Sequence, residues 1–352
     1  MAEPIRILTA VPICDGHDSA IVTINTEFVR RGLEVVYLGY NRSARDIARA
    51  AIQEDVRAVG ISSYNGGHVE FFAEVLKFLR RWSGRHIGVF GGGGGTITKA
   101  DARTMQRRGV DRIFFAGTPF SEMTRFVQEA YGQPITRRSR EEIVKCFAAT
   151  RPRSTSVVGF AGPGGVGKTT LIDELVLRLL RADPETRIAI LSHDPSAAGH
   201  GALLGDRAAM IHSQSDRVFM HSLATRGAKG GLAPATRSWL RCLAAANFDL
   251  VLLETVGIGQ EATPFPSTWV DRRILVMSPE YGSRLQLQKI AMLNSADIIV
   301  LNKADAPSAP TARSEIEDLV ERNARGQRLV STIARRHGDT GVDELFRMLT
   351  SA

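Results

Sequence analysis

The stretch GPGGVGKT, from Gly162 to Thr169, restricts the possible folds of this chain more than any other feature of its sequence. It fits the pattern G-x-x-x-x-G-K-[ST], follows a β-branched apolar run and precedes a helix-like segment, TTLIDELVLRLLR. Glycines in such a loop let backbone N–H groups close around phosphate oxygens at a helix N-terminus. A glycine-rich structural turn is the alternative, but the flanking strand and helix favour a nucleotide site in a parallel α/β domain.

The residues of this loop have separate roles in the predicted site. Lys168 would neutralise the β- and γ-phosphates, and the hydroxyl of Thr169 would hold Mg²⁺. We therefore expect nucleotide contacts from Gly162, Gly164, Gly165, Val166, Gly167, Lys168, Thr169 and Thr170.

Apolar runs alternate with amphipathic segments along the whole chain, which predicts parallel βαβ units. The 352 residues, 43% of them apolar, are too many for one compact core and suit two domains. We expect an α/β protein with two doubly wound parallel-sheet domains, residues 1–132 with five strands and residues 156–352. Residues 133–155 contain a charge run and prolines, and they are interpreted as a linker with one short helix over 141–149.

The net charge of +8 raises the question of a nucleic-acid partner. The arginines are dispersed and not interleaved with aromatics, so a solvated basic surface is favoured, with acidic ligands such as phosphates or acyl-CoA as a second explanation. No stretch approaches the ~20 apolar residues of a spanning helix, and the N-terminus lacks the order of a signal peptide. The cysteines Cys14, Cys146 and Cys242 form no C-x-x-C pair. We expect a cytoplasmic protein with neither nucleic acid nor membrane as a partner.

The segment ADIIVLNKAD predicts which base the nucleotide carries. It places Asn302, Lys303 and Asp305 directly after an apolar strand, and it follows the phosphate loop in the chain. A carboxylate there accepts hydrogen bonds from N1–H and the 2-amino group of guanine, which adenine cannot supply. Leaving that carboxylate unpaired is costly, so the site should prefer GTP.

Acidic residues at the ends of further strands are candidates for a magnesium site and for positioning the attacking water. Asp194 ends the strand in IAILSHDPS, Asp206 lies in LLGDRA, and Glu254 and Thr255 end the strand in FDLVLLETVGIGQ. A helix cap or a surface carboxylate is an equal alternative for each one alone. As an ordered set they favour catalysis, with Lys168, Asp194 and Glu254 as the catalytic residues.

The segments HDPSA…GALLGD, ETVGIGQ and NKAD resemble the G-protein chaperones of adenosylcobalamin-dependent acyl-CoA mutases. Together with SLATRG, Ser222 to Gly227, they are most similar to the fused isobutyryl-CoA mutase group of the methylmalonyl-CoA mutase family. The chain has Ala209 where the family usually carries an arginine. The resemblance implies that the segment from Pro279 to Ile290 reports the nucleotide state to the mutase. It also implies a shell around Mg²⁺ of Thr169, Asp194, Asp206, Glu254 and Thr255.

The first half carries a second resemblance. A lone histidine after a strand is usually a cap, but DGHDSA is similar to the cobalamin-binding signature D-x-H-x-x-G, with Ala20 at the final position. GISSYNGGH, VFGGGGGTI and FFAGT resemble the later landmarks of a flavodoxin-like cobalamin-binding domain. The resemblance implies cobalamin contacts from Asp15, Gly16, His17, Asp18, Ser19, Ala20, Ile21, Ser62, Tyr64, Gly92, Gly93, Gly94, Gly117 and Thr118.

The chemistry of these residues agrees with that role. Cobalt accepts an imidazole nitrogen as axial ligand, so His17 is the expected cobalt ligand. Asp15 could accept the other ring N–H and fix the tautomer, and Ser62 could extend that relay. Glycine-rich strand ends would leave room for the dimethylbenzimidazole tail of the cofactor.

Together the two resemblances imply an adenosylcobalamin-binding small subunit fused to a GTPase chaperone that gates cofactor loading and repair. The mutase would be of the methylmalonyl-CoA or isobutyryl-CoA type. Neither half can supply the barrel that binds the thioester, and the sequence stops at Ala352, so we expect a separate acyl-CoA-binding large subunit. A corrinoid adenosyltransferase is a further expected partner. The alternative is a non-catalytic cobalamin carrier or sensor, and a nickel-insertion GTPase is a weaker third reading because its His/Cys cluster is missing.

Overall fold

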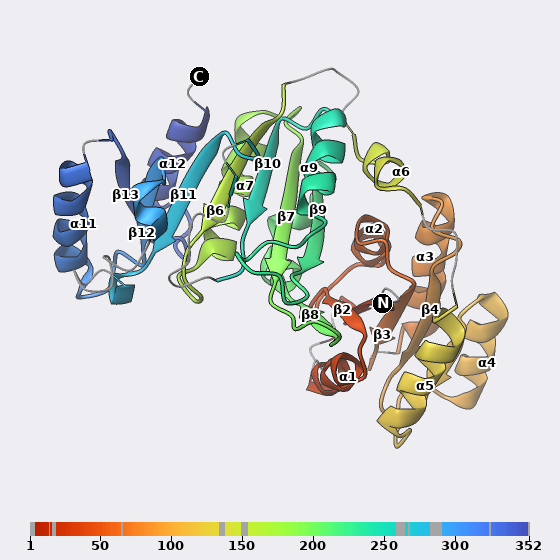
Figure 1. The fold of residues 1–352 in the computed structure, drawn as a ribbon. Coiled ribbons are helices and arrows are strands. Elements are labelled where there is room, and N and C mark those ends of the chain that lie inside the picture. The colour runs from red at the N-terminus through yellow and green to blue at the C-terminus, as the bar shows by residue number, and fades with distance from the viewer. Residues whose placement is uncertain are drawn as a thin grey trace. The chain divides into compact units, whose positions relative to one another are not determined.

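The computed structural model describes residues 4–13, 15, 19–64, 66–133, 138–148, 154–257, 265–266, 268–281, 291–323 and 325–350 (Figure 1). The chain forms two compact units. The first unit consists of Met1–Ile143, Asp194–Ala209 and Met220–Gly227, and the second of Val144–His193, Met210–Phe219 and Ala228–Ala352. Each unit contains a parallel sheet, as expected for two α/β domains. No helix of the described ranges is both long and apolar enough to cross a bilayer.

The sheet of the first unit has the strand order β5-β4-β3-β1-β2-β8, and all its pairs are parallel. The strands are β1 (Arg6–Ala10), β2 (Glu34–Tyr37), β3 (Ala58–Ser62), β4 (Gly88–Gly92), β5 (Arg112–Phe114) and β8 (Ala202–Leu204). The helices are α1 (Ser19–Arg30), α2 (Ala44–Gln53), α3 (His68–Arg81), α4 (Lys99–Arg108) and α5 (Phe120–Tyr131). The order reverses between β1 and β3, and ligands of such sheets bind at that point beyond the carboxyl ends of the strands.

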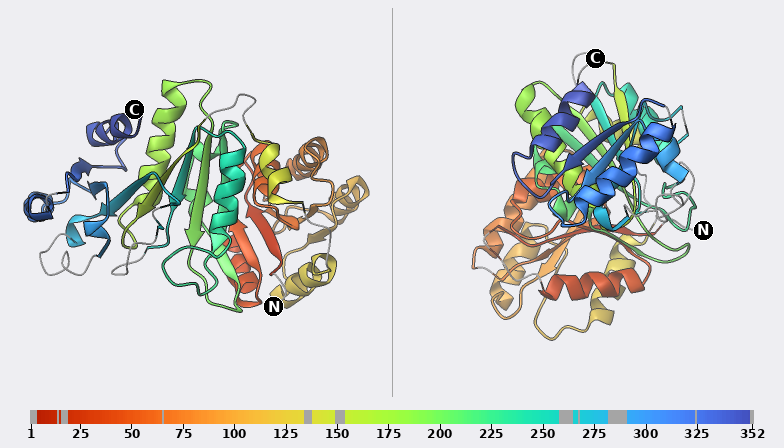
Figure 2. Two further views of the ribbon diagram at one scale, coloured as in Figure 1. Left: turned by 45° about the horizontal axis from the view of Figure 1, so that its top comes forward. Right: turned by 90° about the vertical axis from the view of Figure 1, so that its left-hand side faces the viewer.

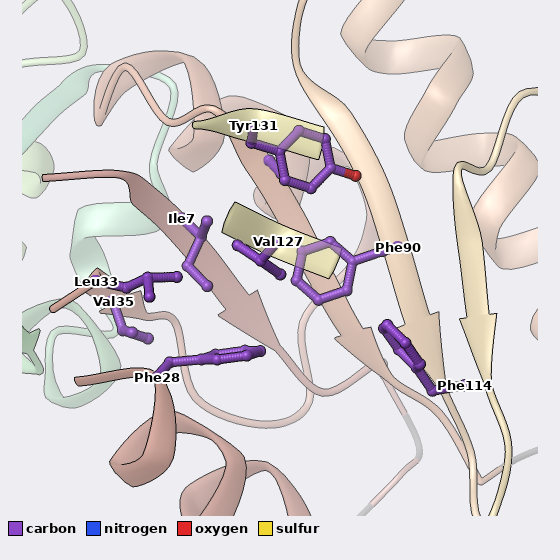
Figure 3. Close-up of a cluster of buried hydrophobic side chains, with 9 residues drawn as sticks. Ile7, Phe28, Leu33, Val35, Phe90, Phe114, Val127 and Tyr131 are labelled. Carbon is purple, nitrogen blue, oxygen red and sulfur yellow. The ribbon is translucent and has the colours of Figure 1, made fainter. Parts of the chain in front are cut away.

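The helices of the first unit divide between the two faces of its sheet. Helix α1 packs with α5, while α2 packs with α3 and α3 with α4. Figure 3 shows the core between the sheet and the α1–α5 pair, where Phe28, Phe90, Phe114 and Tyr131 meet Ile7. Ring centroids of Phe28 and Phe90 are 6.4 Å apart, and those of Phe90 and Phe114 are 6.3 Å apart, both in edge-on geometry. This aromatic cluster supports the strand ends where the reversal point lies.

The sixth strand corrects the expectation of five. Strand β8 comes from a later part of the chain and pairs with β2, with Glu34 opposite Ala202 and Val36 opposite Leu204. In Figure 1 its green ribbon lies beside the red ribbon of β2. The edge of β2 is therefore covered by residues that the sequence assigned to the second domain.

A buried ionic cluster fixes this later segment to the first unit. We call it the Glu54 cluster; it consists of Arg6, Glu34, Glu54, Arg207, His221 and Arg226. Glu54 is fully buried and accepts from Arg6 at 3.4 Å, from Arg207 at 2.9 Å and from the backbone N–H of Ser222 at 2.9 Å. Burial lowers the pKa of His221 well below its usual value, and its Nδ1 lies 2.8 Å from the carbonyl of Gln53. Buried charges persist when each is paired and hydrogen-bonded, as here.

The second unit carries a seven-stranded sheet in the order β13-β12-β11-β6-β10-β7-β9. The strands are β6 (Ser156–Ala161), β7 (Ile188–Asp194), β9 (Val218–Ala224), β10 (Leu250–Glu254), β11 (Arg272–Met277), β12 (Ile298–Asn302) and β13 (Arg328–Thr332). The longer helices are α7 (Lys168–Ala182), α9 (Thr236–Ala245), α11 (Ala309–Asn323) and α12 (Thr340–Thr350). Helices cover both faces of this sheet (Figure 2). The central strand β6 leads directly into the phosphate loop.

The linker helix is shorter than expected. Helix α6 spans Arg140–Lys145 rather than 141–149. Ser139 and Glu142 start it, because the Glu142 carboxylate accepts the backbone N–H of Ser139 at 2.7 Å and the Ser139 hydroxyl accepts that of Glu142 at 3.2 Å. Phe147 follows the end of this helix, and its ring centroid lies 5.6 Å from that of Phe219.

Candidate functional site

The phosphate loop has the geometry that its sequence predicts. It joins β6 to α7, and Gly167 is the N-cap of α7 with a φ of 90°. Gly162 has a φ of 148°, and a Cβ there would lie 2.0 Å from the carbonyl oxygen of Val276 on β11. These positions therefore require glycine. Lys168 Nζ donates to the carbonyls of Gly162 and Pro163, each at 3.1 Å, so the ammonium group lies over the loop.

Two of the predicted magnesium residues meet at this loop. Thr169 Oγ1 donates to Glu254 Oε1 at 2.7 Å, and Glu254 is buried at the end of β10. The loop after β10 lies directly on the phosphate loop, since a Cβ on Gly257 would be 2.5 Å from Gly164 Cα. Thr255 is also buried, and its hydroxyl has no hydrogen-bond partner among the described residues. A hydroxyl and a carboxylate beside a phosphate site are ligands that Mg²⁺ accepts.

This pair fits an ion that arrives with its nucleotide. No group of three or more His, Cys, Asp or Glu side chains in the described parts of the chain could hold a metal. Mg²⁺ in phosphoryl-transfer sites takes one or two protein oxygens and completes its octahedron with phosphate and water. Thr169 and Glu254 supply that number of protein oxygens.

Asp194 and Asp206 belong to the first unit, and they are not brought together with Thr169 within one unit. Asp194 ends β7, and its Oδ1 accepts the backbone N–H of Gly205 at 3.4 Å. Asp206 begins the short helix α8, Asp206–Ala209. Their place in the magnesium shell stays a prediction.

A cavity of about 460 Å³ lies beside the phosphate loop where the guanine base was predicted. It is lined by Gly167, Thr170, Asn302, Lys303, Asp305, Ala306, Pro307, Ile333, Ala334 and Arg335. Asn302 holds this site together, because its Nδ2 donates to the Val166 carbonyl at 2.8 Å and its Oδ1 accepts the Ala334 N–H at 3.0 Å. It therefore joins the phosphate loop to the loop after β13.

Asp305 is paired in this structure with Arg335, a residue that the sequence reasoning missed. The hydrogen bond from Arg335 lowers the pKa of the Asp305 carboxyl group below its usual value. A guanidinium group and a guanine edge both present paired N–H donors to a carboxylate. The position of Arg335 could have been inferred, because β13 lies beside β12 and the carboxyl ends of neighbouring parallel strands meet at one edge.

The second cavity, of about 470 Å³, lies in the first unit at the reversal point of its sheet. Many predicted cobalamin residues line it, namely Ala20, Ile21, Ser62, Tyr64, Gly92, Gly93, Gly94, Gly117 and Thr118. Side chains of the aromatic core, Phe28, Phe90 and Phe114, form other parts of the wall. The cavity is thus largely apolar, as a slot for a heteroaromatic group should be.

Two glycines beside this cavity are required for a reason that the sequence did not indicate. A Cβ on Gly93 would lie 1.6 Å from the Ser63 carbonyl oxygen, and one on Gly94 would lie 2.2 Å from the Tyr64 ring. Glycine is required here because two backbone segments approach closely, and not only because the slot needs room. Gly117 has a φ of 83° with nothing within 4 Å of its missing Cβ, and its role in making room for the tail stays a prediction.

Asp15 is buried, and its Oδ2 accepts the backbone N–H of Tyr64 at 2.5 Å. This bond joins the loop after β1 to the loop after β3, and Tyr64 of the second loop lines the cavity. The predicted cobalt ligand His17 lies outside the described residues, as do Gly16, Asp18 and the side chain of Ser19. The orientation of His17 by Asp15, and the relay through Ser62, therefore remain predictions. Of the predicted switch, only Pro279–Tyr281 is described, as a 3₁₀ turn.

Comparison with known proteins finds a matching family for each half of the chain. The family described as methylmalonyl-CoA mutase-associated GTPase MeaB matches residues 128–350, and the B12 binding domain matches residues 5–123. The chain is 37% identical to the fused isobutyryl-CoA mutase of Cupriavidus metallidurans, with 100% of this chain and 36% of that protein aligned. It is 35% identical to the fused isobutyryl-CoA mutase of Geobacillus kaustophilus, over 97% of this chain and 36% of that protein. It therefore spans little more than a third of the length of these curated relatives.

Proposed function

We propose that this chain holds adenosylcobalamin for an acyl-CoA mutase. It belongs to the methylmalonyl-CoA mutase-associated GTPase family MeaB, and it carries a B12-binding domain before its GTPase domain. Its GTPase would control the loading and repair of that cofactor. The observation that carries the proposal is the presence of two pockets of suitable chemistry in one chain. One is a base pocket with Asp305 beside a phosphate loop, and the other is an apolar slot at the reversal point of the first sheet.

The nucleotide half would work through residues already placed around the phosphate loop. Lys168 would exchange its two carbonyl partners for the phosphate oxygens, and Asp305 would exchange Arg335 for the edge of guanine. Thr169 and Glu254 would hold Mg²⁺, with Asp194, Asp206 and Thr255 as further candidates. When bound, the ion neutralises the charge that develops on the phosphates during transfer. Lys168 and Glu254 would keep the phosphates and the water in line.

The cobalamin half would hold the cofactor through residues near the end of its first strand. His17 would supply an imidazole nitrogen to the cobalt. Asp15 precedes His17 by two positions in the sequence, and its carboxylate is already hydrogen-bonded to the backbone of Tyr64. The dimethylbenzimidazole tail would enter the slot between Ala20, Tyr64 and Gly117. When bound, the cofactor supplies the radical chemistry of the mutase, and this domain supplies binding and orientation.

The mutase reaction also needs a barrel domain that binds the thioester and excludes water. The names of the relatives favour the isobutyryl-CoA type over the methylmalonyl-CoA type. We propose that an acyl-CoA-binding large subunit provides the barrel and that a corrinoid adenosyltransferase delivers the adenosyl form. The alternative proposal, a cobalamin carrier or sensor, would have the same two pockets but no mutase partner.

One set of measurements separates these proposals. The chain should bind cobalamin with a histidine-ligated spectrum, hydrolyse GTP with Mg²⁺, and activate an added large subunit with an acyl-CoA substrate. His17→Ala should remove the spectrum and leave hydrolysis intact, whereas Lys168→Ala should do the reverse. An unchanged spectrum in His17→Ala would overturn the cobalt-ligand assignment. Normal cobalamin and GTP chemistry without activation of any large subunit would favour the carrier or sensor.

A further inference from the structure

In the sheet of the second unit, the pairing of β10 with β7 ends just before Glu254. Strand β10 pairs with β6 up to Glu254, which lies opposite Phe160, but it pairs with β7 only up to Leu253 and Leu191. On the β6 side, the segment continues to be held, because the Thr255 N–H donates to the Phe160 carbonyl at 3.0 Å. On the β7 side, the carbonyl of Glu254 lies past the last paired residue. A buried carbonyl in this position needs a donor.

The imidazole of His193 supplies that donor. His193 lies in β7 beyond the last residue that pairs with β10, and it is 2% exposed. Its Nδ1 is 2.8 Å from the Glu254 carbonyl oxygen. A carbonyl only accepts, so Nδ1 carries the hydrogen and Nε2 is the acceptor of the neutral ring. Nε2 lies 2.7 Å from the hydroxyl of Thr236, the first residue of α9. That hydroxyl also lies 2.6 Å from the carbonyl of Ala233, so the imidazole and the carbonyl share its one hydrogen. The ring therefore bridges α9 and the end of β10.

The residues after Glu254 are also hydrogen-bonded to the region around α9. The backbone N–H of Val256 donates to the Gly231 carbonyl at 3.1 Å, and Gly231 lies in the loop that leads to α9. The side chain of Glu254 in turn accepts the hydroxyl of Thr169 in the phosphate loop. Thr236, His193, Glu254 and Thr169 thus form a continuous chain of contacts that ends at the candidate magnesium site.

We propose that His193 is a positioning residue for GTP hydrolysis, which fixes the main chain of Glu254 so that its carboxylate stays beside Thr169. The inference rests on the proposed roles of Glu254 and Thr169 in holding Mg²⁺. Residues that orient a ligand of a metal ion influence its affinity and the reaction, although they touch neither metal nor substrate. The sequence did not indicate a role for His193, because this residue looks like an ordinary strand residue that precedes Asp194, the predicted magnesium ligand.

The test compares three variants of the full chain. His193→Leu removes the donor but keeps an apolar side chain of similar size, and His193→Asn retains an N–H near the position of Nδ1. Ser192→Ala is the matched control, because Ser192 is the preceding, fully buried residue and its hydroxyl has no partner among the described residues. The readouts are kcat, the KM for GTP, the Mg²⁺ concentration that gives half-maximal hydrolysis, the affinity for GTP without Mg²⁺, and the free energy of unfolding.

His193→Leu should raise the half-maximal Mg²⁺ concentration and lower kcat by about tenfold each, which is the lower end of the effects of residues that orient metal ligands. His193→Asn should recover most of this loss, and Ser192→Ala should stay within about twofold of the parent, since it breaks no hydrogen bond. The affinity for GTP without Mg²⁺ should not change in any variant. A merely structural role of His193 would reduce stability without changing the Mg²⁺ dependence.

Equal losses in His193→Leu, His193→Asn and Ser192→Ala would overturn the inference, and so would an unchanged Mg²⁺ dependence in a folded His193→Leu protein. If His193→Leu does not fold, Thr236→Val replaces it, since it removes the hydroxyl that Nε2 contacts. In that variant the half-maximal Mg²⁺ concentration should rise and kcat should fall, each by less than in His193→Leu. An unchanged Mg²⁺ dependence of Thr236→Val would also refute the inference. If the parent chain shows no Mg²⁺-dependent GTP hydrolysis, it is the proposed function that fails instead.

Discussion

Glu54 and Arg207 are separated by 153 residues in the sequence, yet they form an ion pair of 2.9 Å in which neither side chain is more than 1% exposed. Glu54 ends the second helix of the cobalamin half, and Arg207 follows Asp206 in a segment expected to serve the GTPase. The pair therefore places a piece of GTPase sequence inside the first unit. Whatever moves Arg207 must also rearrange the charges around Glu54.

Removal of the Glu54 carboxylate should destabilise the first unit strongly. Glu54→Ala leaves Arg6 and Arg207 buried without their shared partner, so we expect the free energy of unfolding to fall by about 3–5 kcal/mol. The midpoint of urea-induced unfolding, followed by hydrogen exchange in β1 and β2, measures this. Glu27→Ala is the control, because Glu27 pairs with the half-exposed Arg31 on the surface. That variant should change the unfolding free energy by less than about 1 kcal/mol. A similar small change in both variants would contradict the expectation.

Mild acid should also destabilise the first unit through His221. Burial keeps the pKa of His221 well below its usual value in the folded protein, so the unfolded chain binds a proton that the folded chain does not. Stability should therefore be lost as the pH falls below about 6.5, the ordinary pKa of histidine. The contribution of this residue is about 1.4 kcal/mol for each pH unit.

The corresponding measurement compares unfolding free energies from pH 8 to pH 5 in the parent chain and in His221→Gln. Glutamine can donate to the Gln53 carbonyl but does not titrate. The two slopes should agree above pH 7 and diverge below about pH 6.5, with the parent chain losing more stability. Identical slopes below that pH would show that His221 is not held neutral in the folded state.

Arg335 should compete with guanine for Asp305. The side chain of Arg335 is 78% exposed and that of Asp305 is 32% exposed, so their pairing is a weak one at the surface. Arg335→Ala should strengthen GTP binding by up to about fivefold, because exposed ion pairs of this kind are weak, and the gain should shrink in high salt. Titrations with a fluorescent GTP analogue at low and at high salt measure this gain. Weaker binding in Arg335→Ala would instead assign Arg335 a direct contact with the nucleotide.

Gly93 should be essential for the shape of the cobalamin slot. In Gly93→Ala, the added Cβ would lie 1.6 Å from the Ser63 carbonyl oxygen, so the loops after β3 and β4 must separate. Overpacking of this kind costs about 1–3 kcal/mol, and we expect cobalamin binding to weaken by roughly tenfold. Gly95→Ala is the matched control, since nothing lies within 4 Å of the Cβ it would add. Equal cobalamin affinities of the two variants, measured by absorbance titration, would rule out this role of Gly93.

The sequence was sufficient to predict the structure of those segments whose own residue pattern determines their local conformation. Three glycines of the phosphate loop, Gly162, Gly165 and Gly167, have positive φ angles. The loop has the predicted strand before it and the predicted helix after it. The five strands expected in the first half are present as β1 to β5. Both pockets lie at the carboxyl ends of parallel strands, because connections in such sheets leave open space there.

The features that the sequence did not predict depend on contacts between distant segments. Strand β8 has only three residues, too few for an alternating pattern, and it is a strand only because β2 offers it a partner. Arg335 looks like an ordinary surface arginine until β13 brings it beside Asp305. His193 resembles any polar residue near a strand end, and its role depends on where the pairing of β7 with β10 stops. In each case a neighbouring element determines what the side chain does.

The late origin of β8 has a consequence for how the chain emerges from the ribosome. Helix α5 ends at Tyr131 and β8 ends at Leu204, so 204 − 131 = 73 further residues must be synthesised before the last strand of the first sheet is complete. At about 5–20 residues per second, this takes on the order of 4 to 15 seconds. During that interval the nascent sheet exposes the backbone edge of β2, which is a template for mispairing with other chains. A copy of this protein cut after Gly132 would keep that edge exposed for its whole life, and we expect it to aggregate where the full chain does not.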